Sequence, residues 1–126
     1  MATNKEKEIM KRIKTVKDAR EATGRPEIDF SNLPEDLRDH FAAYYDALVV
    51  VEALNEGRKP DWGNTDERKW YPWFDMSPAG FAFGSSDCDR GNAGAGSGSR
   101  LKLFSEEMAD YAAKQFPEIW EKVQLK

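Results

Sequence analysis

Cysteine and histidine are nearly absent from this sequence of 126 residues, which contains one of each. Cys88 therefore has no partner for a disulfide within the chain. One cysteine and one histidine also exclude the usual zinc sites, whose ligands are mostly drawn from these two residue types. Nothing in the pattern brings His40 close to Cys88 as a nucleophile and base pair. The sequence thus predicts no catalytic residue, no metal-binding residue and no cofactor.

Long hydrophobic runs are missing as well. The longest apolar run, around residues 47–51, is far shorter than the roughly 20 residues that span a bilayer. The stretch MATNKEKEIMKRIK at the N-terminus lacks the apolar segment and the cleavage site of a secretory signal. We therefore expect no membrane contact and a location in the cytoplasm. With 40% hydrophobic residues, the chain has enough apolar material for one modest core and a single domain, residues 1–126.

Charge is distributed unevenly along the chain, although the net charge is only -4. Residues 1–25 contain eight basic and four acidic side chains, whereas residues 26–57 contain eight acidic side chains and one arginine, Arg38. One interpretation is that the two segments neutralise each other inside one fold or across a dimer. The other is that the first segment is a basic arm for nucleic acid. The acidic isoelectric point, near 5.1, favours the former because nucleic-acid-binding domains are usually basic.

Two short helices are predicted near the N-terminus. Residues 4–14 have apolar side chains at the spacing of a short amphipathic helix, whose first turns are expected to fray, so that residues 1–14 would form an arm. Thr15 suits the N-cap of a second helix and Gly24 suits a left-handed stop. This combination predicts a helix over residues 16–23.

The strongest helical pattern covers residues 34–56. Pro34 suits the first helical position, and Gly57 suits the position past the last turn. Apolar residues recur at intervals of four and three, which predicts a stripe that faces the core along the whole helix. The stripe consists of Leu37, Phe41, Tyr44, Leu48 and Val51.

A small antiparallel sheet is predicted between about residues 69 and 104. GFAFG and SRLKLF both alternate in the manner of strands, and we expect them to pair with each other. The segment between them, residues 85–99, is so rich in Gly and Ser that a flexible loop is expected.

A C-terminal helix is predicted after Ser105, which suits an N-cap, and Pro117 is expected to break or kink it. Its apolar face would contain Met108, Ala112 and Phe116. Beyond the break, a short amphipathic tail would contain Ile119, Trp120 and Val123. The predicted class is α+β, with N-terminal helices that include one long core helix, a small antiparallel sheet and a C-terminal helix.

Aromatic residues are concentrated in WYPWF, residues 70–74. One interpretation is that these rings form a second piece of core over the sheet. The other is that one or two stay exposed as a stacking platform for a base, a nucleotide or a protein, with nearby cations supplying charge. Hydroxyl and guanidinium groups beside the free amides of the Gly-rich loop would hold a phosphate or another anion. The candidate ligand-binding residues are Trp62, Arg68, Lys69, Trp70, Tyr71, Trp73, Ser97, Ser99 and Arg100.

The succession VVVEALNEGRKPDWGNTDERKWYPWFDM, GFAF and GSRLKLFSEEMADYAAKQF resembles a group of small proteins encoded by bacteriophages and mobile elements of Bacteroidales bacteria. The similarity covers nearly the whole chain from Ile13 onward. The resemblance implies an accessory protein that acts in the cytoplasm of a bacterial host or is packed into a virion. It transfers no catalytic residue.

Three hypotheses for the function follow. The leading one is a non-enzymatic binding protein, a counter-defence factor that captures a host protein or a nucleotide-like signal through the aromatic segment and the Gly/Ser loop. A second is a single-stranded nucleic-acid-binding protein that uses the same rings and the basic N-terminal arm. A third is a structural virion component, a homo-oligomer in which exposed aromatic side chains seal a subunit interface.

Overall fold

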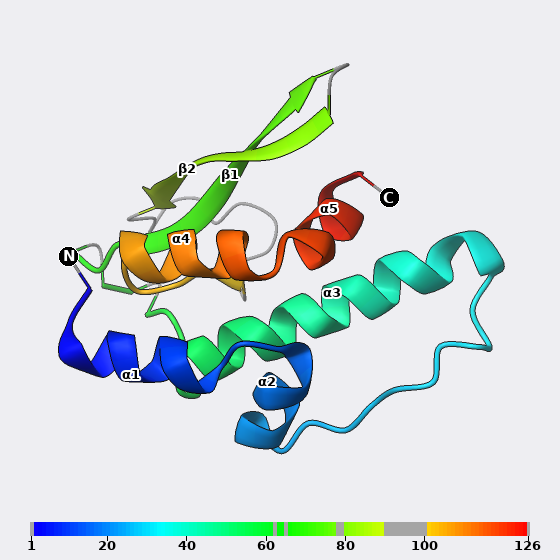
Figure 1. Ribbon diagram of the computed structural model, residues 1–126, viewed down its shortest axis with the longest axis horizontal. Coiled ribbons are helices and arrows are strands. Elements are labelled where there is room, and N and C mark those ends of the chain that lie inside the picture. Colours follow the sequence, from blue (N-terminus) through cyan, green and yellow to red (C-terminus); the bar gives the residue numbers. More distant parts are fainter. Residues whose placement is uncertain (1, 62, 65, 78–79, 90–100, 126) are drawn as a thin grey trace.

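The structure is a computed structural model that describes residues 2–61, 63–64, 66–77, 80–89 and 101–125. It confirms the predicted α+β class. Figure 1 shows α4 between the β-hairpin and the long helix α3, with α1 and α2 lying along the other side of α3. The elements in chain order are α1 (Asn4–Arg12), α2 (Val16–Thr23), α3 (Glu35–Leu54), β1 (Lys69–Ser77), β2 (Gly80–Asp89), α4 (Glu106–Gln115) and α5 (Pro117–Leu125).

Capping residues set the ends of the first two helices. The Thr15 hydroxyl accepts the amide of Asp18, and the Asp18 carboxylate accepts the amide of Thr15, which completes a capping box. Gly24 adopts φ 74°, the left-handed conformation that ends α2. The prediction for residues 16–23 is therefore confirmed. α1 also begins with a capping box and is docked through a buried Ile9; how far its first turn frays in solution stays a prediction.

Asp18 makes the stability of this helix junction sensitive to acid. A hydrogen bond from the backbone amide of Lys14 contributes most to lowering the pKa of the Asp18 carboxyl, and the bonds with Thr15 add to it. Because the pKa is lower in the folded state, the stabilisation is present above the unfolded pKa and is lost as the pH falls through the folded pKa. We expect Asp18→Asn to melt below the parent protein at about pH 7, and the difference to vanish near about pH 2.

Thermal melts at several pH values measure this difference. The matched control is Glu21→Gln, a substitution that neutralises an exposed carboxylate on the same helix. A gap between Asp18→Asn and the parent protein that stays constant with pH would contradict the assignment.

α3 matches the predicted long helix, with corrections at both ends. Pro34 occupies the N-cap position instead of the first helical position, and the last helical residue is Leu54. Glu56 and Gly57 then take the left-handed conformation, with φ values of 52° and 79°. Gly57 is suited to this region, whereas Glu56 is a residue that rarely adopts it.

The predicted core stripe of α3 is only partly correct. Val51 is buried, and Tyr44 and Leu48 are partly buried against the core. Leu37 and Phe41 are instead 40% and 46% exposed. The reason is that α3 is longer than the layer that covers it, so its first turns extend past the other helices (Figure 1).

The sheet has a different pairing from the predicted one. β1 pairs antiparallel with β2, from Lys69 opposite Asp89 to Ser77 opposite Gly80, with a register shift after Trp73. The predicted pairing of GFAFG with SRLKLF is wrong. Leu103 instead touches the outer edge of β1, where its amide and carbonyl bond the backbone of Trp70 at 2.7 and 2.8 Å.

A short connection explains the observed pairing. Only two residues separate β1 from β2 in the chain, so closing this hairpin costs little entropy. Pro72 lies within β1, and a strand at the edge of a small sheet tolerates proline. β2 also continues to Asp89, so residues 85–89 of the predicted loop belong to a strand. Residues 90–100 lie outside the described part of the chain.

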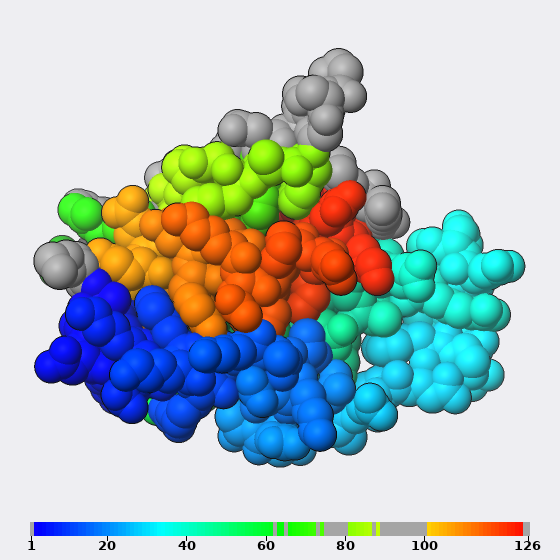
Figure 2. Space-filling view, in the orientation of Figure 1, coloured from blue at the N-terminus to red at the C-terminus, as the bar shows by residue number. Residues whose placement is uncertain are grey.

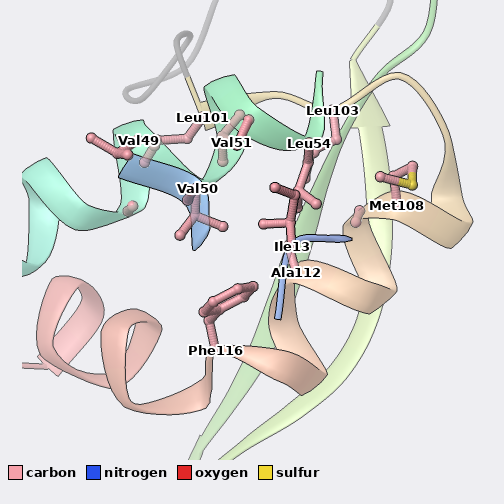
Figure 3. Close-up of a cluster of buried hydrophobic side chains, with 14 of the residues drawn as sticks. Ile13, Val49, Val50, Val51, Leu54, Leu101, Leu103, Met108, Ala112 and Phe116 are labelled. Atoms are coloured by element: carbon pink, nitrogen blue, oxygen red, sulfur yellow. The ribbon is translucent and has the colours of Figure 1, made fainter. Parts of the chain in front are cut away.

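The core forms where α3, α4, the N-terminal helices and the 101–103 segment meet. Figure 3 shows Ile13, Val50 and Phe116 facing this interior from three different elements. The predicted face of the C-terminal helix is confirmed, because Met108, Ala112 and Phe116 are all buried. The predicted break is confirmed as well: α4 ends at Gln115 and α5 begins at Pro117. No helix in the described residues is both long enough and apolar enough to cross a membrane.

Candidate functional site

Two rings of the aromatic segment belong to the core. Trp70 and Phe74 both pack against the buried cluster. Phe74 stacks on Phe81 at 4.6 Å between ring centroids, and its centroid lies 6.0 Å from that of Trp120. The structure thus supports the interpretation of these rings as a second piece of core.

The cations beside the rings are mostly used inside the protein. Lys69 is fully buried, and its ammonium group donates to the Asn64 carbonyl at 2.8 Å and lies 3.7 Å from the Glu67 carboxylate. The ammonium group of Lys102 lies 3.7 Å from the centroid of the half-buried Tyr71 ring. Arg68 is exposed.

The other predicted ligand-binding residues lie outside the described part of the chain. This applies to Trp62, Ser97, Ser99 and Arg100, and to the side chain of Trp73, whose backbone is in β1. Where side chains are described, no ring between residues 70 and 74 is more than half-exposed. The described residues therefore do not assemble the predicted stacking platform.

The basic N-terminal segment is paired with the acidic segment that follows it. This confirms the interpretation that the two neutralise each other within one fold. Such pairing leaves less positive charge for nucleic acid. The ion pairs are Lys5 with Glu56 at 3.4 Å, Arg12 with Glu56 at 3.3 Å, Arg20 with Glu27 at 3.4 Å and with Asp46 at 3.8 Å, and Arg25 with Glu52 at 3.0 Å.

Exposed large apolar side chains occur on the first turns of α3 and on the connection before it. Among the described residues they are Leu37 and Phe41 on α3, and Ile28 on the connection before it, which is 46% exposed. Leu37 and Phe41 are four residues apart and so lie on the same face of the helix. Figure 2 shows this region, in cyan, as a projection at the edge of the molecule. We call the surface formed by Ile28, Leu37 and Phe41 the α3 tip.

Specific contacts hold the α2–α3 connection against α3. The hydroxyl of Tyr45 donates to the Pro26 carbonyl at 2.6 Å, and the Tyr45 ring meets the Phe30 ring edge-on at 6.2 Å. Arg38 donates from Nε to the Leu33 carbonyl at 2.9 Å. In the sequence, Ile28 lies between Pro26 and Phe30, the two residues that contact Tyr45. The exposed side chains of the α3 tip are therefore carried on anchored backbone.

Negative charge surrounds the α3 tip. Residues 27–41 contain five carboxylates, one arginine (Arg38) and the histidine His40. A hydrogen bond from the Ser31 amide lowers the pKa of Asp29, so this carboxyl stays ionised. Glu35 and Asp36 occupy the first turn of α3, where the helix dipole favours anions.

The acidic character continues along α3 toward α5. Asp39, Asp46 and Lys122 line a shallow hollow of about 230 Å³ between the two helices. Burial raises the pKa of Asp46, and the guanidinium of Arg20 opposes this effect. Asp39 stands between Leu37 and Phe41 in the chain, but residues two apart lie on different faces of a helix, so the hollow and the exposed apolar pair lie on different sides of α3.

A larger hollow, of about 460 Å³, lies between α1 and the C-terminal end of α3. Its charged lining residues have partners within the protein. Lys5 pairs with Glu56, while the Arg58 guanidinium lies 3.5 Å from the centroid of the Phe104 ring and pairs with Glu67 at 3.3 Å. No group of three or more His, Cys, Asp or Glu residues in the described ranges is placed to hold a metal ion.

Comparison with protein-family models, with curated proteins and with solved structures found no match. The candidate site is therefore argued from its own geometry.

The sequence contained one signal for the α3 tip. In EDLRDHFA, at the start of α3, only Leu37 and Phe41 are large and apolar, whereas the segment from Ala47 to Val51 is continuously apolar. A helix that is dense in apolar residues at one end only is buried at that end. The difference between the two ends of α3 therefore indicates burial of its C-terminal half and exposure of its first turns.

Proposed function

We propose that this protein is a non-enzymatic binding protein that captures a partner protein through the α3 tip. The observation that carries the proposal is the exposure of Leu37 and Phe41, one turn apart on α3, together with the exposure of Ile28 on the anchored connection before the helix. Fully burying an exposed Leu or Phe side chain contributes about 1.5–3 kcal/mol, so a partner that covers the 40–46% of Leu37 and Phe41 still exposed gains part of that free energy. Clustered exposed apolar side chains are typical of interaction sites.

The resemblance to phage and mobile-element proteins supplies the setting of the proposal. The partner would be a protein of the bacterial host, and the capture would act as counter-defence. A nucleotide-like ligand is less well supported, because Lys69, Trp70 and Phe74 are engaged inside the fold. The single-stranded nucleic-acid hypothesis loses support because the N-terminal cations pair with carboxylates of the same chain.

The double variant Leu37→Ser/Phe41→Ser tests the proposed function. We expect it to weaken partner binding by at least about 100-fold, because a few central apolar residues dominate most interfaces. The free energy of unfolding should change by less than about 1 kcal/mol, since both side chains are already far from buried. The variant thus separates binding from folding.

The measurement begins with affinity capture from a lysate of the bacterial host. The captured protein is identified and purified, and its affinity for the parent protein and for the variant is measured by calorimetry. Phe41→Leu is the matched control, because it keeps an apolar side chain at this position and should keep most of the affinity. Equal binding by the parent protein and the double variant would refute the proposal.

A further inference from the structure

We infer that the α3 tip recognises a basic amphipathic helix of its partner, an inference that rests on the proposed function. Two features of the surface carry it: the sign of its charge and the direction of its apolar stripe.

The charge of the tip selects a cationic partner. Glu35, Asp36 and Asp39 are all exposed on the first turns of α3, and residues 27–41 contain no lysine and only one arginine, Arg38, besides His40. Such a concentration of one sign raises the association rate of a cationic segment and repels an anionic one. A second copy of this chain would bring the same carboxylates to the interface, which disfavours pairing of tip against tip.

The direction of the stripe favours a helix over an extended strand. From Leu37 and Phe41 the same face of α3 continues to Tyr44 and Leu48, which are half-buried. From Leu37 to Leu48, twelve residues of helix rise roughly 16 Å, about three turns of a partner helix. The amides and carbonyls within α3 are used by the helix itself, so a partner strand would find no edge to pair with. A partner helix with apolar residues at intervals of four and three would match the spacing of the side chains on this face of α3.

Salt concentration provides an independent signature of the charge. The carboxylates of the tip are exposed, so their attraction for lysine is screened as ionic strength rises. The apolar contribution from Leu37 and Phe41 lacks this screening. Affinity should therefore fall with salt toward a plateau set by the apolar contacts.

Three synthetic peptides of about 18 residues test the inference, a length at which helices form readily on binding. The first has leucines at helical intervals of four and three with lysine on its other faces. The second keeps the leucines and replaces lysine by glutamate. The third has the composition of the first in scrambled order. Binding of each labelled peptide to the full-length protein is measured by fluorescence anisotropy at several salt concentrations.

The patterned lysine peptide should bind at least about tenfold more tightly than either of the others. The variant Glu35→Gln/Asp36→Asn/Asp39→Asn should weaken its binding about tenfold at low salt and flatten the salt dependence. The control Glu8→Gln/Glu21→Gln/Glu106→Gln removes three exposed carboxylates on α1, α2 and α4 and should change the affinity less than twofold.

The outcomes separate the inference from the proposed function. If the glutamate peptide binds as tightly as the lysine peptide, and binding is lost in Leu37→Ser/Phe41→Ser, the tip is a protein-binding surface and the basic partner is wrong. If lysine-peptide binding is unaffected by Leu37→Ser/Phe41→Ser, the tip is not the binding surface and both proposals fail. A dimer in light scattering that this double variant dissociates would replace the basic helix by a second copy.

Discussion

Replacing Trp120 by alanine is expected to lower the free energy of unfolding by about 3–5 kcal/mol, the cost of removing a large buried ring. Trp120 is only 3% exposed, and its ring centroid lies 6.0 Å from that of Phe74. Its indole N–H donates to the carbonyl of Ala112 at 3.1 Å, across the break at Pro117. One side chain thus connects α5, the end of α4 and the β-hairpin.

Denaturant unfolding of Trp120→Ala and of Trp120→Phe measures this effect. The phenylalanine variant keeps most of the buried ring area and loses the hydrogen bond, so its cost should be nearer about 1–2 kcal/mol. A loss below about 1 kcal/mol in the alanine variant would contradict the placement of this ring in the core.

Lys69→Met is expected to destabilise the protein by about 3 kcal/mol, although lysine-to-methionine changes at exposed sites are nearly neutral. The ammonium group of Lys69 is fully buried, where it donates to the Asn64 carbonyl and lies beside the Glu67 carboxylate. Methionine occupies a similar volume but makes neither contact. The change therefore isolates the role of the charge in holding residues 64–67 against the start of β1.

A double-mutant cycle with Glu67→Gln measures the coupling between the two charges. Glu67 also accepts the amide of Asp61 at 2.8 Å, so its own replacement should cost stability as well. If the two charges act together, the double variant should lose less than the sum of the single losses. Lys102→Met provides a comparison with Lys69→Met, because Lys102 is also buried but its ammonium group faces the Tyr71 ring. A neutral Lys69→Met would show that this ammonium contributes nothing to the fold.

Features set by neighbouring residues could be predicted from the sequence. Thr15, Asp18 and Gly24 define α2 within one short segment, and Pro117 alone separates α4 from α5. The burial of Trp120 also follows from the local pattern of the tail. In each case the residues that make the decisive contacts lie within about two helical turns of one another.

Features that depend on distant contacts could not be predicted. The alternation in GFAFG predicts a strand but does not select its partner, and Pro72 made the true partner, β1, look unlike a strand. The apolar stripe of α3 does not show where its cover ends, because α4 and α5, which cover part of it, lie more than 40 residues further along the chain. Lys69 looked like a surface cation for the same reason: its partners are recognisable only once the turn before β1 is folded.

The position of the binding surface is the central claim, and nuclear magnetic resonance tests it most directly. Protein with labelled leucine methyl groups and indole nitrogens is titrated with the patterned lysine peptide. The account predicts that the Leu37 methyl signals shift with peptide concentration, while the indole signals of Trp70 and Trp120 stay in place. Shifts in those indole signals with unchanged Leu37 methyl signals would contradict it and move the binding surface to the aromatic hairpin.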